Sequence, residues 1–83
     1  MIYKVLIKLY VPEISETYEM YIPINKTVGE ITFSLCKLIN SLSKVYPICN
    51  NKRLMNRMTG ELYDRDITIR DSNIRNGCEL VIY

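Results

Sequence analysis

The chain has 83 residues, 48% of them hydrophobic and 24% charged, with 11 Lys and Arg against 9 Asp and Glu. Residues 1–83 are expected to fold as one domain, because a single core usually takes on the order of 100 residues. So small a core leaves little surface for a deep catalytic cleft, and a net charge of +2 disfavours nucleic acid as a partner, since affinity for phosphates grows with the number of basic contacts.

The residue types needed for catalysis and metal binding are missing or scattered. The sequence contains no histidine, so neither Ser-His-Asp nor Cys-His activation of a nucleophile is available. Cys36, Cys49 and Cys78 are widely spaced, which predicts reduced structural thiols and no metal site. No uncharged apolar run approaches the roughly 20 residues that cross a bilayer. We therefore expect a cytoplasmic protein that is not an enzyme, has no cofactor and does not insert into membranes.

Two alternating segments at the start of the chain predict an antiparallel β-hairpin. Side chains alternate through residues 3–10, the period of a strand with one buried face. A loop over 11–15 returns the chain, and the second alternating segment ends at Pro23, because proline terminates strands. The expected inward side chains are Tyr3, Val5, Ile7, Leu9, Tyr18, Met20 and Ile22, and the outward ones are Lys4, Leu6, Lys8, Tyr10, Thr17, Glu19 and Tyr21.

A capping box predicts where a helix begins. In Thr27-Val28-Gly29-Glu30, the threonine hydroxyl and the glutamate carboxylate can each bind the other residue's backbone N–H. Residues 28–42 are expected to lay one apolar face on the sheet and to join two parallel strands. That face comprises Val28, Ile31, Leu35, Leu38, Ile39 and Leu42. Phe33 falls on the opposite side, either as a contact residue for a partner or as an aromatic ring partly covered by a loop.

The second half of the chain alternates turns with short apolar segments. Residues 43–51 are expected to form a loop, and residues 53–58 and 61–63 short strands about the turn Thr59-Gly60. The segment 64–75 is expected to be held to the core by Ile67, Ile69 and Ile74. A tight turn at Asn76-Gly77 leads into a final strand. In it, the inward side chains are those of Cys78, Leu80 and Ile82, and the outward ones those of Glu79, Val81 and Tyr83.

This order of elements resembles the ubiquitin-like, or β-grasp, superfamily. The residues that carry the resemblance are Arg53-Leu54-Met55, Thr59-Gly60-Glu61-Leu62-Tyr63-Asp64, Ile69-Arg70-Asp71-Ser72-Asn73-Ile74 and Leu80-Val81-Ile82. They are similar to segments of ubiquitin in the same order, and the resemblance covers nearly the whole chain. It implies an α+β fold in which a mixed sheet of four to five strands packs on one main helix.

Within this superfamily the chain resembles the bacterial YukD/EsaB family. The similar segments are Thr59-Gly60-Glu61-Leu62, Asp71-Ser72-Asn73-Ile74 and Asn76-Gly77-Cys78-Glu79-Leu80. Ser72-Asn73 departs from the family, which has a tyrosine after the aspartate, and the helix lacks a glycine C-cap. Members of the family are small cytoplasmic accessory proteins of type VII (ESX/Ess-type) secretion systems. The resemblance implies a non-catalytic interaction module with a protein partner, a membrane-anchored secretion component being one candidate.

Two other functions stay open. Covalent modifiers and sulfur carriers of the same fold act through a C-terminal Gly-Gly tail, whereas this sequence ends Leu80-Val81-Ile82-Tyr83. No covalent transfer is therefore expected unless the native chain continues past Tyr83. An adaptor in an unrelated pathway, viral or eukaryotic, would show the same sequence features.

The expected binding surface is the face of the sheet that the helix leaves open. Ubiquitin is recognised there through an apolar patch, and strand alternation extends the matching positions into an apolar centre with a basic rim, the composition of a protein contact. The alternative is an ordinary sheet surface or a homodimer contact, and we expect a monomer or a weak homodimer. The site residues are Leu6, Met55, Val81 and Tyr83 in the centre, Lys4, Lys8 and Arg53 in the rim, and Phe33 on the helix as the next candidate.

Overall fold

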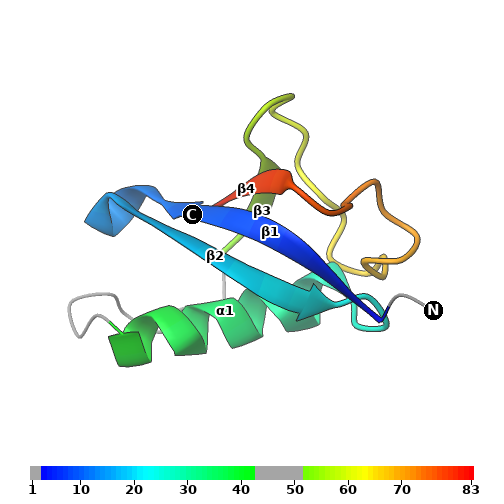
Figure 1. Cartoon of the computed structure of the whole chain (residues 1–83), viewed down its shortest axis with the longest axis horizontal. Coiled ribbons are helices and arrows are strands. Elements are labelled where there is room, and N and C mark those ends of the chain that lie inside the picture. Colours follow the sequence, from blue (N-terminus) through cyan, green and yellow to red (C-terminus); the bar gives the residue numbers. More distant parts are fainter. Residues whose placement is uncertain (1–2, 43–51) are drawn as a thin grey trace.

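The computed structural model describes residues 3–42 and 52–83, so the expected loop over 43–51, with Cys49, lies outside the described residues. The elements follow the expected order (Figure 1). They are β1 (Lys4–Val11), a 3-10 turn (Pro12–Ile14), β2 (Glu16–Pro23), α1 (Val28–Leu42), β3 (Leu54–Asn56) and β4 (Cys78–Ile82).

The strands of the described residues form one mixed sheet of four, in the order β2-β1-β4-β3. β1 pairs with β2 in antiparallel and with β4 in parallel orientation, and β3 pairs antiparallel with β4. β2 and β3 therefore run in the same direction, as expected for the strands that the helix connects. α1 lies along one face of the sheet and leaves the other face open (Figure 1).

The β1–β2 hairpin confirms the expected alternation. Val5, Ile7 and Leu9 are buried, and Leu6 and Lys8 between them are on the more exposed, outward face. β1 also includes Val11, which is buried at the end of the strand and not part of the loop. Tyr3, expected on the inward face, is 63% exposed because it precedes the first residue of β1.

The third strand is shorter than expected because Asn56 starts a turn. The Oδ1 atom of Asn56 accepts hydrogen bonds from the backbone N–H groups of Met58 and Thr59 (2.8 and 3.1 Å). Such local side-chain bonds compete with strand pairing. Of the expected strand over 61–63, one bridge from Leu62 to Met55 is present among the described residues.

α1 begins and ends at the expected residues, but its buried face is rotated. That face consists of Val28, Ile31, Thr32, Leu35, Cys36 and Ile39. Leu38 and Leu42, expected on it, are 41% and 58% exposed. The two smaller buried side chains, Thr32 and Cys36, occupy one flank of the face, which turns Leu38 to the opposite margin. Leu42 is exposed as the last residue of the helix.

The expected capping box is formed and makes stability depend on pH. Glu30 Oε1 accepts a hydrogen bond from the Thr27 N–H (3.1 Å), and Thr27 Oγ1 accepts one from the Glu30 N–H (3.2 Å). The bonds from the backbone and the hydroxyl of Thr27 hold the pKa of Glu30 below its ordinary value of 4.5. A carboxyl of this kind adds stability above its unfolded pKa, and the contribution is lost as pH falls through the folded pKa.

We therefore expect Glu30→Gln to lower the melting temperature at neutral pH. Its difference from the unaltered protein should shrink as pH falls below 4.5, because both then carry an uncharged side chain at this position. Thermal unfolding followed by circular dichroism across the acid range measures the difference. A deficit that stays constant into acid would show that the carboxylate charge does not contribute.

The irregular segment between β3 and β4 is held by both apolar and polar contacts. Tyr63 is buried, its hydroxyl donates to Asn73 Oδ1 (2.7 Å), and it accepts from Asn56 Nδ2 (3.0 Å). Burial raises the pKa of Tyr63. The expected apolar anchors are all at least partly buried, namely Ile67, Ile69 and Ile74.

The expected turn at Asn76-Gly77 attaches β4 to the start of the chain. Gly77 has φ of +85°, a conformation that favours glycine. Its N–H donates to Leu6 O (2.8 Å), and Asn76 Oδ1 accepts a hydrogen bond from the Leu6 N–H (2.7 Å). The turn therefore fixes where β4 meets β1.

Candidate protein-binding surface

The open face of the sheet carries its outward side chains in rows that cross the strands. Tyr10 of β1 lies beside Val81 of β4, and Val81 lies beside Met55 of β3. Tyr83 follows β4 and exchanges backbone hydrogen bonds with Arg53. We call Tyr10, Met55, Val81 and Tyr83 the open-face patch.

Side-chain contacts join the members of the open-face patch. The Tyr83 hydroxyl donates to Met55 Sδ at 3.9 Å. The Arg57 guanidinium lies 4.7 Å from the centroid of the Tyr10 ring, a cation–π geometry. Tyr83 is 45% exposed, whereas Val81 is 7% exposed. The patch thus presents aromatic rings and a thioether over a buried aliphatic residue, a combination that gives large and adaptable contact area.

A row of alternating charges borders the open-face patch. The strand register places Glu19 beside Lys8 and Lys8 beside Glu79. Arg57 completes the row, with Nη1 3.9 Å from Glu79 Oε1. Exposed pairs of this kind contribute about 0–1 kcal/mol each. The position of the row matters more, because it separates the open-face patch from Leu6, which pairs with β2 beyond it.

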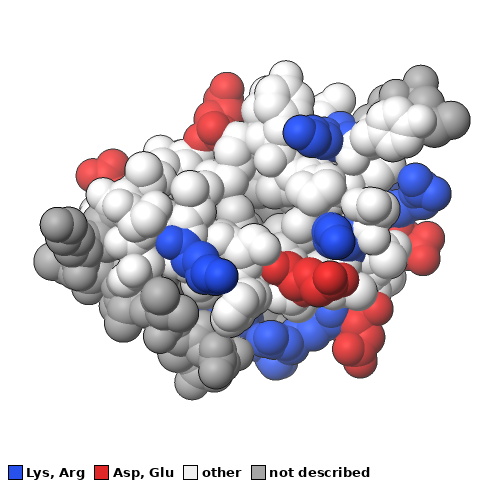
Figure 2. Space-filling model, turned by 90° about the horizontal axis from the view of Figure 1, so that it is seen from below, with Lys and Arg blue, Asp and Glu red and all other residues white. Residues whose placement is uncertain are grey.

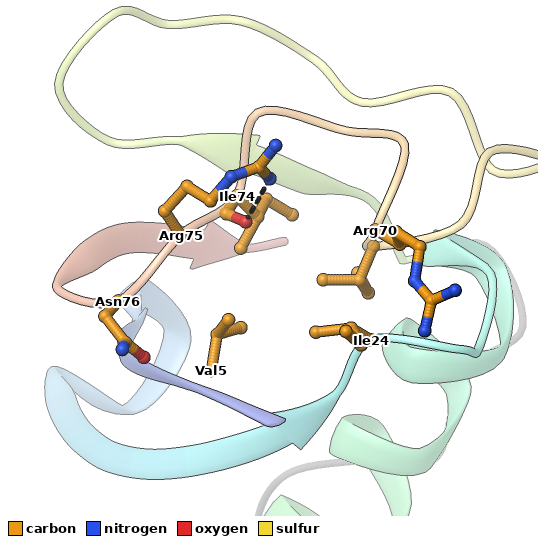
Figure 3. Close-up of a pocket in the computed structure, with 7 residues that line it drawn as sticks. Val5, Ile24, Arg70, Ile74, Arg75 and Asn76 are labelled. Carbon is orange, nitrogen blue, oxygen red and sulfur yellow. Dashed lines mark hydrogen bonds between the residues drawn. The ribbon is translucent and has the colours of Figure 1, made fainter. Parts of the chain in front are cut away.

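A pocket of about 410 Å³ lies elsewhere, beside the first residues of β1. Val5, Ile24, Ile69 and Ile74 line it with apolar side chains. Arg70 and Arg75 stand on opposite sides of it (Figure 3). Arg75 Nη1 donates to the carbonyl oxygens of Ser72 and Ile74 (2.7 and 2.8 Å). None of the site residues expected from the sequence lines this pocket.

A groove of about 340 Å³ runs between β2 and α1. Its apolar walls include Met20, Ile22, Leu35 and Leu38. Figure 2 views the α1 side of the molecule, where Lys and Arg side chains are interspersed with Asp and Glu. This face therefore offers an apolar groove within a surface of mixed charge.

Comparison with solved structures identifies the fold. No protein-family model and no curated protein matches the chain. A chain of the "MycP5-free ESX-5 inner membrane complex, State II" superposes with a TM-score of 0.81 at 16% identity over 99% of this chain, which spans 21% of that chain. A chain of a toluene 4-monooxygenase HD complex gives 0.79 at 14% identity, covering 95% of both chains. The ubiquitin of Caldiarchaeum subterraneum gives 0.71 at 20% identity, over 95% of this chain and 90% of that one.

The fold is the ubiquitin-like β-grasp.

In this ubiquitin-like protein the expected site residues do not form one surface. Those beside or within the open-face patch are Arg53, Met55, Val81 and Tyr83, whereas Lys8 belongs to the charged row and Lys4 and Leu6 lie beyond it. Phe33 is exposed as expected, with Lys37 Nζ 5.4 Å from its ring centroid, but it lies on α1 and not on the open face. The structure therefore keeps the expected site residues of the second half of the chain together. It separates them from Lys4, Leu6 and Lys8 on β1 and from Phe33 on α1.

The expectation that Val81 is exposed is wrong. β4 is an interior strand of the sheet, so Val81 has a larger neighbour on each side, Tyr10 and Met55. These neighbours cover its short side chain and leave 7% of it exposed. Val81→Asp therefore reports on the stability of the fold and not on binding. A binding test needs a substitution at Met55 alone.

Sequence reasoning missed two residues of this surface, Tyr10 and Arg57. Tyr10 shares the outward parity of Leu6 and Lys8 along β1, and Arg57 shares that of Arg53 and Met55. Alternation alone could have found both. What it could not supply was the register of β1 against β4, which decides that Tyr10 and not Leu6 lies beside Val81.

Within the described residues of this ubiquitin-like protein, no group of three or more Cys, Asp or Glu side chains is arranged to hold a metal ion. In the same part of the chain, no helix has the length and apolar character needed to cross a membrane. The open-face patch, the pocket and the groove are three surface features among the described residues from which a function can be argued.

Proposed function

We propose that this ubiquitin-like protein is a non-catalytic protein-interaction module, a YukD-like cytoplasmic accessory component of a type VII secretion system. The observation that carries the proposal is the likeness to a chain of the ESX-5 inner membrane complex, with a TM-score of 0.81 over 99% of this chain. The sequence resemblance to the YukD/EsaB family supports it independently. The partner is then a protein of the secretion machinery, and components anchored in the membrane are candidates.

The open-face patch is the surface through which the module would bind. Met55 and Tyr83 offer exposed or partly exposed contact area. Aromatic residues and methionine are enriched at protein interfaces. Arg53 and Arg57 flank the patch, so an apolar partner surface with an acidic rim would complement it.

The test combines gene deletion with complementation in the native host. We expect deletion to reduce secretion of the small helical-hairpin WXG proteins, and the unaltered gene to restore it. Met55→Asp should not restore secretion, because a carboxylate in the patch removes apolar contact and repels an acidic rim. Loss of a hot-spot contact costs about 2 kcal/mol or more, which weakens binding by about 30-fold. Binding is measured by co-purification with the membrane complex of the secretion system.

Met58→Asp is the matched control for this experiment. It makes the same chemical change at an exposed turn residue outside the open-face patch, so it should restore secretion fully. Secretion that is unaffected by deletion would refute the secretion role and favour an adaptor in another pathway. If Met55→Asp restores secretion as fully as Met58→Asp does, the open-face patch is not the binding surface.

A further inference from the structure

One edge of the sheet is unpaired along a whole strand. β2 has eight residues and is the outermost strand in the order β2-β1-β4-β3 (Figure 1). The other edge is covered, since Asn56 N–H donates to Glu61 O (2.8 Å) and Tyr63 N–H donates to Leu54 O (3.1 Å) beside β3. A long regular edge is a template for pairing with another strand. The described residues provide no such strand for β2.

The register shows which backbone groups of β2 face outward. Ile24 N–H donates to Tyr3 O (3.0 Å), and bonded pairs in an antiparallel ladder recur at every second residue. The even-numbered residues of β2 therefore bond to β1. Thr17, Glu19 and Tyr21 direct their N–H and C=O groups away from the sheet.

We infer that β2 pairs with β2 of a second copy of this chain, antiparallel about a two-fold axis. The inference goes beyond the proposed function and uses the edge opposite the open-face patch. β2 has an uneven charge distribution: Glu16 and Glu19 lie in its first half, apolar and aromatic residues fill its second half, and Lys26 follows it. An antiparallel copy lays the acidic half of each strand against the uncharged second half of the other, so the acidic halves are kept apart.

Charge also selects the register of the pair. Two registers place the outward N–H and C=O groups of β2 opposite those of the second copy, so that hydrogen bonds can form. In both of them the two strands overlap almost fully. In one, Glu19 faces Glu19 of the second copy, and like charges directly opposite each other destabilise a sheet. In the other, Glu19 faces Tyr21 of the second copy and the two Met20 residues meet at the two-fold axis. The second register is therefore favoured.

The favoured register covers apolar surface that the single chain exposes. On the α1 side, the partly exposed Tyr18 faces Ile22 of the second copy, which is already buried in the single chain, on either side of the partly exposed Met20 pair. This row continues the wall of the groove between β2 and α1, beside Leu38, which is 41% exposed. On the open face the pair brings Tyr21, 66% exposed, against Glu19 of the second copy. Burial of such apolar area favours association.

Sedimentation velocity on a proline variant tests the pairing. Tyr21→Pro removes an outward N–H that β1 does not use, so it should block pairing and leave the hairpin intact. Tyr21→Val is the matched control, because it also removes the aromatic ring but keeps the N–H. From micromolar to millimolar concentration, the unaltered protein and Tyr21→Val should shift toward a dimer, and Tyr21→Pro should stay monomeric. Thermal melting at the lowest concentration checks that Tyr21→Pro folds.

Cysteine crosslinking tests the register without relying on proline. The two Met20 residues would form a non-hydrogen-bonded pair with Cα atoms about 4.5 Å apart, which a disulfide can span. With Cys49→Ser and Cys78→Ser in both proteins, Met20→Cys should give several-fold more disulfide dimer under mild oxidation than Glu19→Cys, whose thiols meet only in the other register.

The inference is overturned if the unaltered protein is a monomer at every concentration, or if Tyr21→Pro associates as strongly as Tyr21→Val. It is also overturned if neither cysteine variant crosslinks, and equal crosslinking or an excess from Glu19→Cys overturns the register. None of these variants changes the open-face patch, so the secretion assay on Met55→Asp is read independently of them.

Discussion

Val81→Asp is expected to lower the free energy of unfolding by about 3 kcal/mol or more, a large share of the roughly 4–12 kcal/mol typical of a chain this long. Val81 is 7% exposed, between Tyr10 and Met55 on the neighbouring strands. The substitution removes the favourable transfer of an aliphatic side chain out of water and puts a carboxylate in its place. Urea denaturation followed by circular dichroism measures the loss.

Tyr83→Asp provides the comparison, because it places the same carboxylate two residues along on the same face. Tyr83 is 45% exposed, so the expected change in the free energy of unfolding is about 1 kcal/mol or less. The deficit of Val81→Asp should also shrink in acid, since a protonated carboxyl costs less to bury. Equal stability of the two variants would show that position 81 is open to water.

Leu80→Ala is expected to cost about 2–5 kcal/mol, the range for removing a leucine side chain from a close-packed core. Leu80 is fully buried, on an interior strand, and its parallel partner in the register is Leu9. Removing it leaves a cavity between the sheet and α1 that rigid neighbours fill only in part. The midpoint of urea denaturation should fall while its slope stays unchanged.

Leu38→Ala makes the identical change at a leucine that is 41% exposed. Here the lost contacts are few and alanine favours the helix, so the expected change is within about 1 kcal/mol. Since the chemistry is the same at both positions, the difference between the variants reports burial. Similar losses at Leu80 and Leu38 would mean that the buried face of α1 is misplaced.

Local signals predicted the regular elements of this fold well. The capping box of Thr27 and Glu30, followed by apolar residues at helical spacing, placed α1 at 28–42, where the structure has it. Alternation predicted the hairpin and the inward residues of β4. These signals are reliable because each depends on the backbone geometry of neighbouring residues and not on distant parts of the chain.

Two kinds of feature were predicted less well: those in which a side chain competes with strand pairing for backbone hydrogen bonds, and those that depend on tertiary contacts. Strand alternation continues through Arg57, yet β3 ends at Asn56 because the Asn56 side chain bonds the following N–H groups. Leu38 has helical spacing suited to the core, yet the sheet meets a different flank of α1. Apolar periodicity predicts neither outcome. It shows that a helix or strand has an apolar face, but not exactly which residues of that face contact the rest of the core.

The extent of the open-face patch was predicted only in part for a similar reason. Parity along a strand assigns each residue to a face, and the resemblance to ubiquitin placed Met55 and Tyr83 on the open face, where the structure has them. It does not say which residues of other strands lie alongside. The parallel register of β1 and β4 brings Tyr10 to Val81 and puts Lys8 and Glu79 between them and Leu6. One long-range pairing thus decides both the burial of Val81 and the extent of the patch.

The interior position of β4 also affects how the chain acquires its sheet during synthesis. β4 comes last among the strands but lies between β1 and β3. The β1–β2 hairpin and α1 depend on contacts close in sequence, so they can form early on the nascent chain. β3 has no partner in the sheet until residues 78–82 leave the ribosome, and closing so long a loop is slow. Until then the inner edge of β1 is open, so the nascent chain passes through a stage in which it can pair with the wrong strand.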